Sequence, residues 1–169
     1  MITLISFANY LSILPLVFAI FISIYYIGSL VFSKIPYIFS EKYILGYFSS
    51  IFIAQLIKYI LFPFFDFAKR PEGACGCDYI SQKGDVSGRP GCPSGHMSTT
   101  AYFVVYNLML LINGDFIKKN INKKIFIVLN VLLLLLMAWA RYYKKCHSFI
   151  QILLGIILGS ILAYFFHNN

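Results

Sequence analysis

Charged residues are scarce in this sequence. Only 12% of its 169 residues are Asp, Glu, Lys or Arg, whereas these types make up roughly 25% of an average soluble domain. Hydrophobic residues account for 60%, and the mean hydropathy is +0.78. The charged residues are clustered, which leaves several uncharged runs. The length of these runs is close to that needed to cross a bilayer, about 20 residues. The composition excludes an ordinary soluble domain and predicts an integral membrane protein.

A nucleic-acid-binding pattern is also missing. Basic residues outnumber acidic ones by 14 to 6, which gives a formal net charge of +8. However, the basic residues stand at the ends of apolar segments, where they anchor helices and meet anionic lipid headgroups. We therefore expect the membrane lipid bilayer as a partner, and no nucleic acid. No basic region precedes the first apolar run and no small-residue cleavage site follows it, so we expect no cleaved signal peptide.

The apolar runs predict the fold. We expect an all-α fold, a multi-pass transmembrane helical bundle of five spans, or six, that forms a single membrane domain over residues 1–169. The first span has room to begin earlier as a longer tilted helix. Alternation across the membrane places two polar segments on one side, the Cys/Gly/Pro-rich loop 66–95 and the short segment 140–148. The expected spans cover residues 10–32, 43–65, 97–112, 125–139 and 149–166.

All four cysteines lie on the side that carries these polar segments. Lys and Arg are divided almost evenly between the two faces and do not indicate the orientation, but segregated cysteines suit disulfides in an oxidising compartment. We therefore expect a luminal or extracytoplasmic active face. Cys75 and Cys77 are poorly placed to bond to each other, so we expect two disulfides in which each pairs with Cys92 or Cys146. The alternative is a four-thiolate zinc site, although C-x-C lacks the usual spacing of zinc ligands.

The first pattern with candidate chemistry is Pro93-Ser-Gly-His96, at the start of the third expected span. Pro and Gly break regular structure, and the polar residues can cap a helix whose free N–H groups attract an anion. Ser94 adds a hydroxyl donor, Gly95 allows close backbone approach, and His96 would stand beside a bound anion. The plain alternative is a loop-to-helix turn with an incidental histidine.

The second pattern is Arg141-x5-His147, between the last two expected spans. Arginine is suited to bidentate binding of phosphate, and a neutral histidine can attack phosphorus. The alternative is a basic cluster that anchors a helix end at the membrane interface.

The third pattern is Lys69-Arg70-Pro71, just after the second expected span, with Lys58 inside that span. An ionisable residue within a membrane helix is a functional candidate. The alternative for Lys58 is that its side chain snorkels to the nearer interface.

Taken in their order along the chain, the three patterns resemble the phosphatidic acid phosphatase type 2 family of the vanadium haloperoxidase superfamily, in its membrane lipid phosphatase branch. The family pattern is Lys-x6-Arg-Pro, then Pro-Ser-Gly-His, then Ser-Arg-x5-His-x3-Asp. This sequence matches the second part in full over 93–96 and keeps the spacing from Arg141 to His147. The resemblance covers about residues 45–165, and it implies a phosphatase that needs no metal or cofactor.

The resemblance also implies a role for each matched residue. His147 would attack phosphorus and form a phosphohistidine intermediate. His96 would protonate the leaving group and later activate water. Positioning and charge stabilisation would supply the catalysis. The phosphate-binding residues would be Arg70, Ser94, Gly95, Arg141 and, as the weaker candidate, Lys58.

The sequence departs from the family pattern in three places. Gln151 stands where the family has the aspartate that orients the nucleophilic histidine, and its carbonyl can accept the same hydrogen bond but brings no charge. Ala140 replaces the serine before the arginine. Pro63 stands where the family spacing would place a lysine before Arg70.

Several residues compete for the first part of the pattern. Lys58 fits the helical context but requires an insertion, whereas Lys69 is adjacent to the arginine. Arg89, followed by a proline, is a second arginine-proline candidate that lies too near Pro93 for the usual arrangement. We therefore favour Lys58 together with Arg70.

The expected function is hydrolysis of a phosphate or diphosphate ester on a membrane lipid, of the phosphatidic acid or isoprenyl/dolichyl diphosphate type. A site at headgroup level favours lipid phosphates over soluble sugars. One alternative is a lipid phosphotransferase that uses an alcohol in place of water. Another is a catalytically weak homologue that binds lipid phosphate, which Gln151 motivates. The sequence carries no signal for the oligomeric state.

Overall fold

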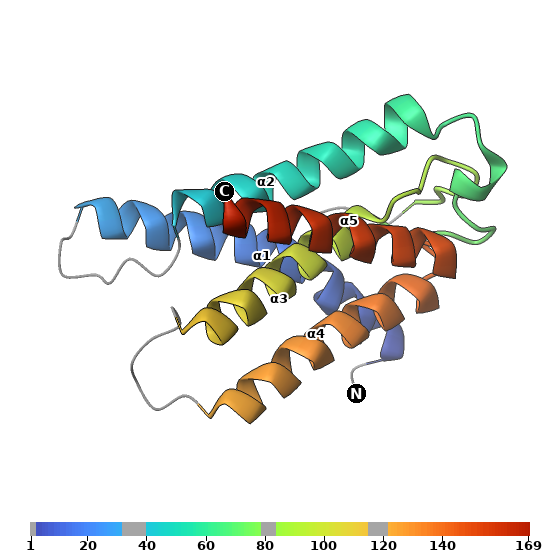
Figure 1. Ribbon diagram of the computed structural model, residues 1–169. Coiled ribbons are helices and arrows are strands. Elements are labelled where there is room, and N and C mark those ends of the chain that lie inside the picture. The colour runs from blue at the N-terminus through green and yellow to red at the C-terminus, as the bar shows by residue number, and fades with distance from the viewer. Residues whose placement is uncertain (1–2, 32–39, 79–83, 115–121) are drawn as a thin grey trace.

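Helices dominate the computed structural model, which describes residues 3–31, 40–78, 84–114 and 122–169 (Figure 1). Within these ranges there is no named β-strand, only two isolated bridges, and the all-α prediction is confirmed. Much of the predicted connectors 33–42 and 113–124 lies outside the described residues. The elements are α1 (Leu4–Val31), α2 (Glu41–Leu56), the π-helical turn η1 (Ile57–Leu61), the 3-10 turn η2 (Asp66–Ala68), α3 (Gly95–Asn113), α4 (Lys123–Tyr143) and α5 (Phe149–Asn168).

Polar side chains fix where four of the helices begin. Ser40, Ser94, Asn122 and Ser148 each accept a hydrogen bond from a backbone N–H in the first turn of α2, α3, α4 and α5. The cap of α5 is a complete capping box, in which Gln151 accepts in return from the N–H of the capping serine. Two of these caps adjoin His96 and His147, so both histidines stand at helix N-termini.

Four helical segments are long and apolar enough to cross a membrane: α1, α2 with its η1 continuation, α4 and α5. They support an integral membrane protein. The sequence predicts a fifth span, but α3 is not among these segments. The reason is its central position, because α3 packs against α5, α2 and α4 (Figure 1). Its polar residues, Ser98, Thr99, Thr100 and Asn107, are buried against protein, so this helix need not be apolar on every side.

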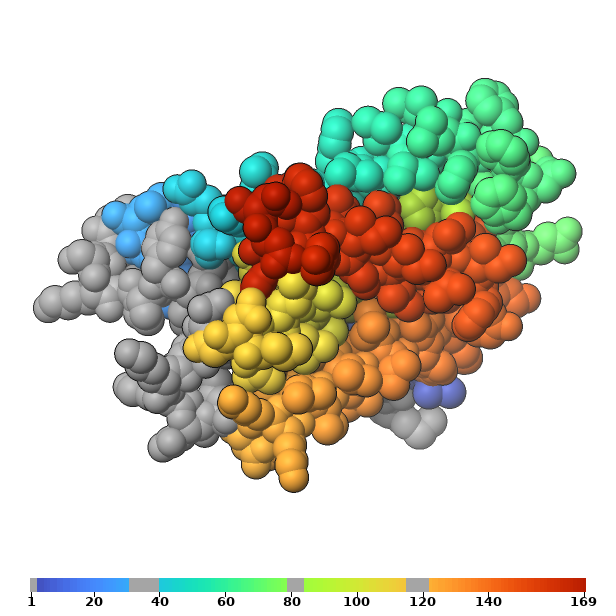
Figure 2. All heavy atoms as spheres, viewed as in Figure 1, coloured from blue at the N-terminus to red at the C-terminus, as the bar shows by residue number. Residues whose placement is uncertain are grey.

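Two glycines let α3 and α5 cross closely. A Cβ atom added at Gly155 would lie 2.6 Å from the carbonyl oxygen of Ser94, and one added at Gly159 would lie 2.9 Å from the backbone nitrogen of Tyr102. Small residues permit this kind of backbone approach between membrane helices. In the space-filling view, α5 covers the middle of one face, between α2 and α4 (Figure 2). The crossing brings the N-terminal ends of α3 and α5 together.

The two polar segments meet at one end of the bundle. A disulfide joins Cys77 to Cys146, and Lys144 donates to the carbonyl of Gly76 at 2.6 Å. This disulfide agrees with the predicted pairing and excludes a four-thiolate zinc site. The second predicted disulfide is wrong, because Cys75 and Cys92 are both free.

The two free thiols are held on different parts of the loop. Cys75 is exposed and forms an isolated bridge with Asp85, whereas Cys92 is buried and its N–H donates to the carbonyl of Ala68 at 3.2 Å. Burial raises the pKa of the Cys92 thiol to about 11, so this thiol stays protonated near neutral pH.

Candidate active site

The segment Ser94–His96 forms the N-terminal end of α3. Ser94 Oγ accepts from the Met97 N–H at 3.4 Å, and all residues of this segment are buried. Ser94 is therefore seen as the helix cap, and its hydroxyl oxygen is engaged by the helix backbone. Gly95 and His96 both line a small cavity.

His147 lies on the short loop between α4 and α5 and is only 2% exposed. Its Nδ1 is 3.3 Å from Oε1 of Gln151. The amide nitrogen of Gln151 faces two backbone carbonyls, at 2.9 and 2.7 Å, and these can only accept. The oxygen must therefore face His147, so Nδ1 carries the proton in this hydrogen bond. This tautomer leaves the Nε2 lone pair available for attack.

Burial and neighbouring cations keep His147 neutral. Burial is the largest cause that lowers its pKa well below the ordinary value of 6.5, and the charges of Arg141, Arg70 and Lys58 lower it further. The hydrogen bond to Gln151 acts in the opposite direction. A neutral imidazole is the nucleophilic form.

The cavity between the histidines is small, at about 40 Å³. It therefore admits only a compact group. The residues that line it come from the end of α2, η1, the polar loop, the start of α3 and the α4–α5 loop: Gln55, Lys58, Tyr59, Arg70, Cys77, Asp78, Gly95, His96 and His147.

Two buried cations face this cavity. Arg70 donates to the carbonyl of Cys146 at 3.1 Å, directly before His147. Lys58 donates to Oε1 of Gln55 at 3.1 Å. Burial is the main cause that lowers the pKa of the Arg70 guanidinium, and the charge of Asp78 partly offsets it.

The competing basic residues are placed elsewhere. Lys69 is half-exposed and pairs with Asp66 at 2.7 Å. Arg89 is exposed, and its carbonyl accepts from the N–H of Arg70 at 2.9 Å. Neither is among the described residues that line the cavity.

Arg141 occupies an unexpected position. It is fully buried, and it donates to Oγ of Ser12 on α1 at 2.9 Å and to the carbonyl of Cys77 at 2.6 Å. Among the described residues, it is not one that lines the small cavity. Its charge nevertheless acts on His147. In this structure, Arg141 lies behind the cavity wall.

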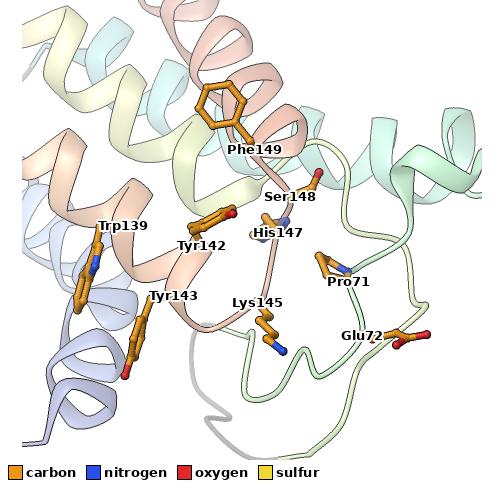
Figure 3. A pocket seen from close by; sticks show the side chains of 9 residues that line it. All are labelled: Pro71, Glu72, Trp139, Tyr142, Tyr143, Lys145, His147, Ser148 and Phe149. Atoms are coloured by element: carbon orange, nitrogen blue, oxygen red, sulfur yellow. The ribbon is translucent and has the colours of Figure 1, made fainter.

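A larger groove of about 870 Å³ reaches His147 from outside (Figure 3). Trp139, Tyr142 and Tyr143 approach it from the end of α4, and Phe149 from the start of α5 (Figure 3). Pro71, Glu72, Lys145 and Ser148 complete its lining. The groove is therefore mainly aromatic, with charged groups only on its loop side.

Sequence reasoning missed four residues at or behind the site. Gln55, Tyr59 and Asp78 line the cavity, and Ser12 binds the buried arginine. Gln55 could have been predicted from its spacing, because it lies three residues before Lys58 and so shares its helix face. Ser12 could not have been predicted, since its partner Arg141 lies 129 residues away in the sequence.

The fold and the site together define a class of protein: a helical chain suited to a membrane, with two buried histidines and buried cations around one small cavity. Residues 41–169 match the PAP2 superfamily, and the chain belongs to this superfamily. Membership implies phosphatase or phosphoesterase activity. The match leaves α1 outside, although α1 supplies the serine that binds Arg141. No curated protein and no solved structure matches the chain.

Proposed function

We propose that the protein hydrolyses a phosphate or diphosphate ester of a membrane lipid through a phosphohistidine on His147. One observation carries this proposal: the neutral His147, with its Nδ1 proton directed at Gln151, shares a small cavity with His96, Arg70 and Lys58. These residues supply a nucleophile, an acid and two positive charges without requiring a metal ion.

The reaction has two steps in this cavity. His147 Nε2 attacks phosphorus, the bond to the leaving oxygen breaks, and His96 gives that oxygen its proton. His96 then takes a proton from water, which attacks phosphorus and breaks the P–N bond, so that phosphate leaves and His147 becomes neutral again. Arg70 and Lys58 stabilise the charge on the phosphoryl oxygens. The bound anion favours the protonated form of His96 before the first step.

The aromatic groove supports a lipid leaving group. It is much larger than the cavity, and both contain His147 in their lining. A phosphoryl group in the cavity would therefore place the remainder of the ester in a groove lined by Trp139 and Phe149, which suits an apolar chain. The four membrane-length helices support a multi-pass protein, and the disulfide supports an extracytoplasmic site.

The central test is phosphate release from phosphatidic acid and isoprenyl diphosphate by the detergent-solubilised protein. We expect His147→Ala to lower the rate by at least about a thousandfold, and an acid-labile phosphoryl label to be trapped on the wild type only. His167→Ala is the matched control, because His167 is half-buried near the other end of α5 and bonds to Asn113. Lipid binding without turnover by the wild type would overturn the proposed enzyme.

A second comparison tests the lipid part of the proposal. Phe149→Ala should raise KM for a long-chain lipid phosphate several-fold and leave KM for p-nitrophenyl phosphate unchanged, since only the former fills the groove. An equal effect on both substrates would contradict the role of the groove. Products formed on the alcohol when glycerol is added would instead indicate a phosphotransferase.

A further inference from the structure

One buried residue touches all three segments that carry the candidate site. Gln151 lies in the first turn of α5 and has no exposed surface. Its amide nitrogen donates to the carbonyls of Phe67 at 2.9 Å and Lys69 at 2.7 Å. Its amide oxygen lies 3.3 Å from Nδ1 of His147. Its own backbone carbonyl accepts from the Ser94 N–H at 3.1 Å, so the three segments meet at this one residue.

The segment that leads to Arg70 is held through three successive carbonyls. The first and third accept from the Gln151 amide, and the middle one, on Ala68, accepts from the N–H of Gly91 at 2.7 Å. The packing here is tight, because a Cβ atom at Gly91 would lie 2.8 Å from Cγ of Arg70 and 2.9 Å from Oε1 of Gln151. The arginine side chain therefore starts from a backbone fixed by the glutamine.

We propose that Gln151 is a positioning residue that fixes the positions of Arg70 and His147 relative to each other, and that an amide is required for this task. The inference rests on the proposed function, because it concerns the geometry of the same site. The residue needs an acceptor toward His147 and two donors toward the loop, and a neutral amide provides both. Gln151 is then adapted to this site rather than a weakened substitute for a carboxylate.

A carboxylate at this position would meet the wrong partners. It would accept from His147 as well as the amide does, but it has no proton to donate. Its second oxygen would face two carbonyl oxygens at the distances that the amide nitrogen now spans, 2.7 to 2.9 Å. Both carbonyls would lose their donor in a buried environment, which is costly, and the segment before Arg70 would move away.

Two pairs of variants of equal length separate the amide from the carboxylate. Gln151→Glu keeps the length of the native side chain, and we expect kcat/KM for phosphate release to fall roughly ten- to a hundredfold. Gln151→Asn and Gln151→Asp share a shorter length, and the Asn variant should be the more active of the two. An Asp variant that equals or exceeds the Asn variant, or a Glu variant that equals the wild type, would overturn the proposal.

A double-mutant cycle shows whether the effect runs through the arginine. Gln151→Glu keeps an acceptor for His147, so its loss should come mainly from the Arg70 segment. In an Arg70→Ala background, the same change should therefore lower kcat/KM by less than about threefold. If Gln151→Glu lowers kcat/KM by the same factor with and without Arg70, the positioning role is contradicted. A general structural defect would give that result, because it does not depend on Arg70.

Asn130→Asp is the matched control for burying a carboxylate. Asn130 is a buried amide on α4 that donates to the carbonyl of Phe126 at 2.9 Å, and it lies about 16 Å along the helix from Arg141. We expect its kcat/KM to match the wild type, and a loss as large as that of Gln151→Asp would overturn the specific role of Gln151.

A binding measurement keeps this inference separate from the proposed function. Inorganic orthovanadate serves as a phosphate analogue, and its affinity is measured for the wild type and Gln151→Glu. If the wild type releases no phosphate from any ester, the proposed function fails. Weaker orthovanadate binding by the variant would still support the positioning role, and equal binding would overturn it.

Discussion

The two ends of the helical bundle are stabilised by different interactions. At the site end, a disulfide and hydrogen bonds from Arg70, Arg141 and Gln151 to backbone carbonyls join the loops. The other half of the bundle has a large core cluster that contains Tyr43, Tyr47, Tyr102 and Tyr106. Directional bonds fix atoms more narrowly than apolar contacts do, so changes at the site end should affect catalysis first and changes at the tyrosine end should affect folding first.

Among the variants that compare the two ends, the largest effect is expected at Arg70. Arg70→Ala removes a buried cation that lines the cavity, and kcat/KM should fall by about a hundred- to a thousandfold. Lys69→Ala, the adjacent control, removes only a surface ion pair with Asp66 and should remain within about twofold. Steady-state phosphate release measures both variants. Equal losses of kcat/KM in the two variants would contradict a specific role for the buried Arg70.

The disulfide should contribute to both folding and activity. Cys77→Ser should lower the free energy of unfolding by roughly 2–4 kcal/mol, and should also lower kcat, because the carbonyls of Cys77 and Cys146 accept from Arg141 and Arg70. Thermal unfolding and phosphate release in detergent would show both. Cys75→Ser is the control, since Cys75 is a free exposed thiol. Unchanged activity after full reduction would contradict the connection between this disulfide and the site.

His147 should make the site end sensitive to acid. Its pKa is well below 6.5 in the folded protein, so the neutral nucleophile persists below that pH and the limb of kcat/KM due to His147 should lie below 6.5. The unfolded chain binds this proton near pH 6.5, so His147 should also lower stability as the pH falls through that value. His147→Asn should remove this part of the stability change. A loss of stability below pH 6.5 that is the same in the wild type and in His147→Asn would be contrary evidence.

The smallest effect is expected at the tyrosine end. Tyr102→Phe removes a hydroxyl that donates to the carbonyl of Tyr43 at 3.1 Å, and the free energy of unfolding should fall by about 1 kcal/mol. kcat should not change, because Tyr102 is not among the described residues that line the cavity. A change in kcat without a change in stability would refute the division between the two ends.

Local features of the sequence predicted much of this structure. Apolar runs gave α1, α2, α4 and α5, and the polar residues around Ser94 indicated where α3 begins. The motifs also identified His96, His147 and Arg70, which the structure places around one cavity. These features are readable because periodicity and capping depend on residues close together in the chain.

Non-local contacts account for the rest. Nothing in the sequence favoured Cys77 over Cys75 as the partner of Cys146, because that choice depends on how the polar loop folds back. Ser12 could not be connected with Arg141, because they lie on different helices. The bonds from Gln151 to the loop, 82 and 84 residues earlier, were equally hidden.

The two glycines of α5 have a consequence for how a substrate can enter. Gly155 and Gly159 let α5 pack directly against the backbone of α3, with no space for a side chain between them. The two helices therefore form one tightly packed pair. His96 and His147 lie at the same end of this pair, so separating the helices would move the proposed nucleophile away from the proposed acid. Under the proposed function, a lipid phosphate would therefore enter beside this helix pair, at the aromatic groove next to α4, while α3 and α5 stay packed.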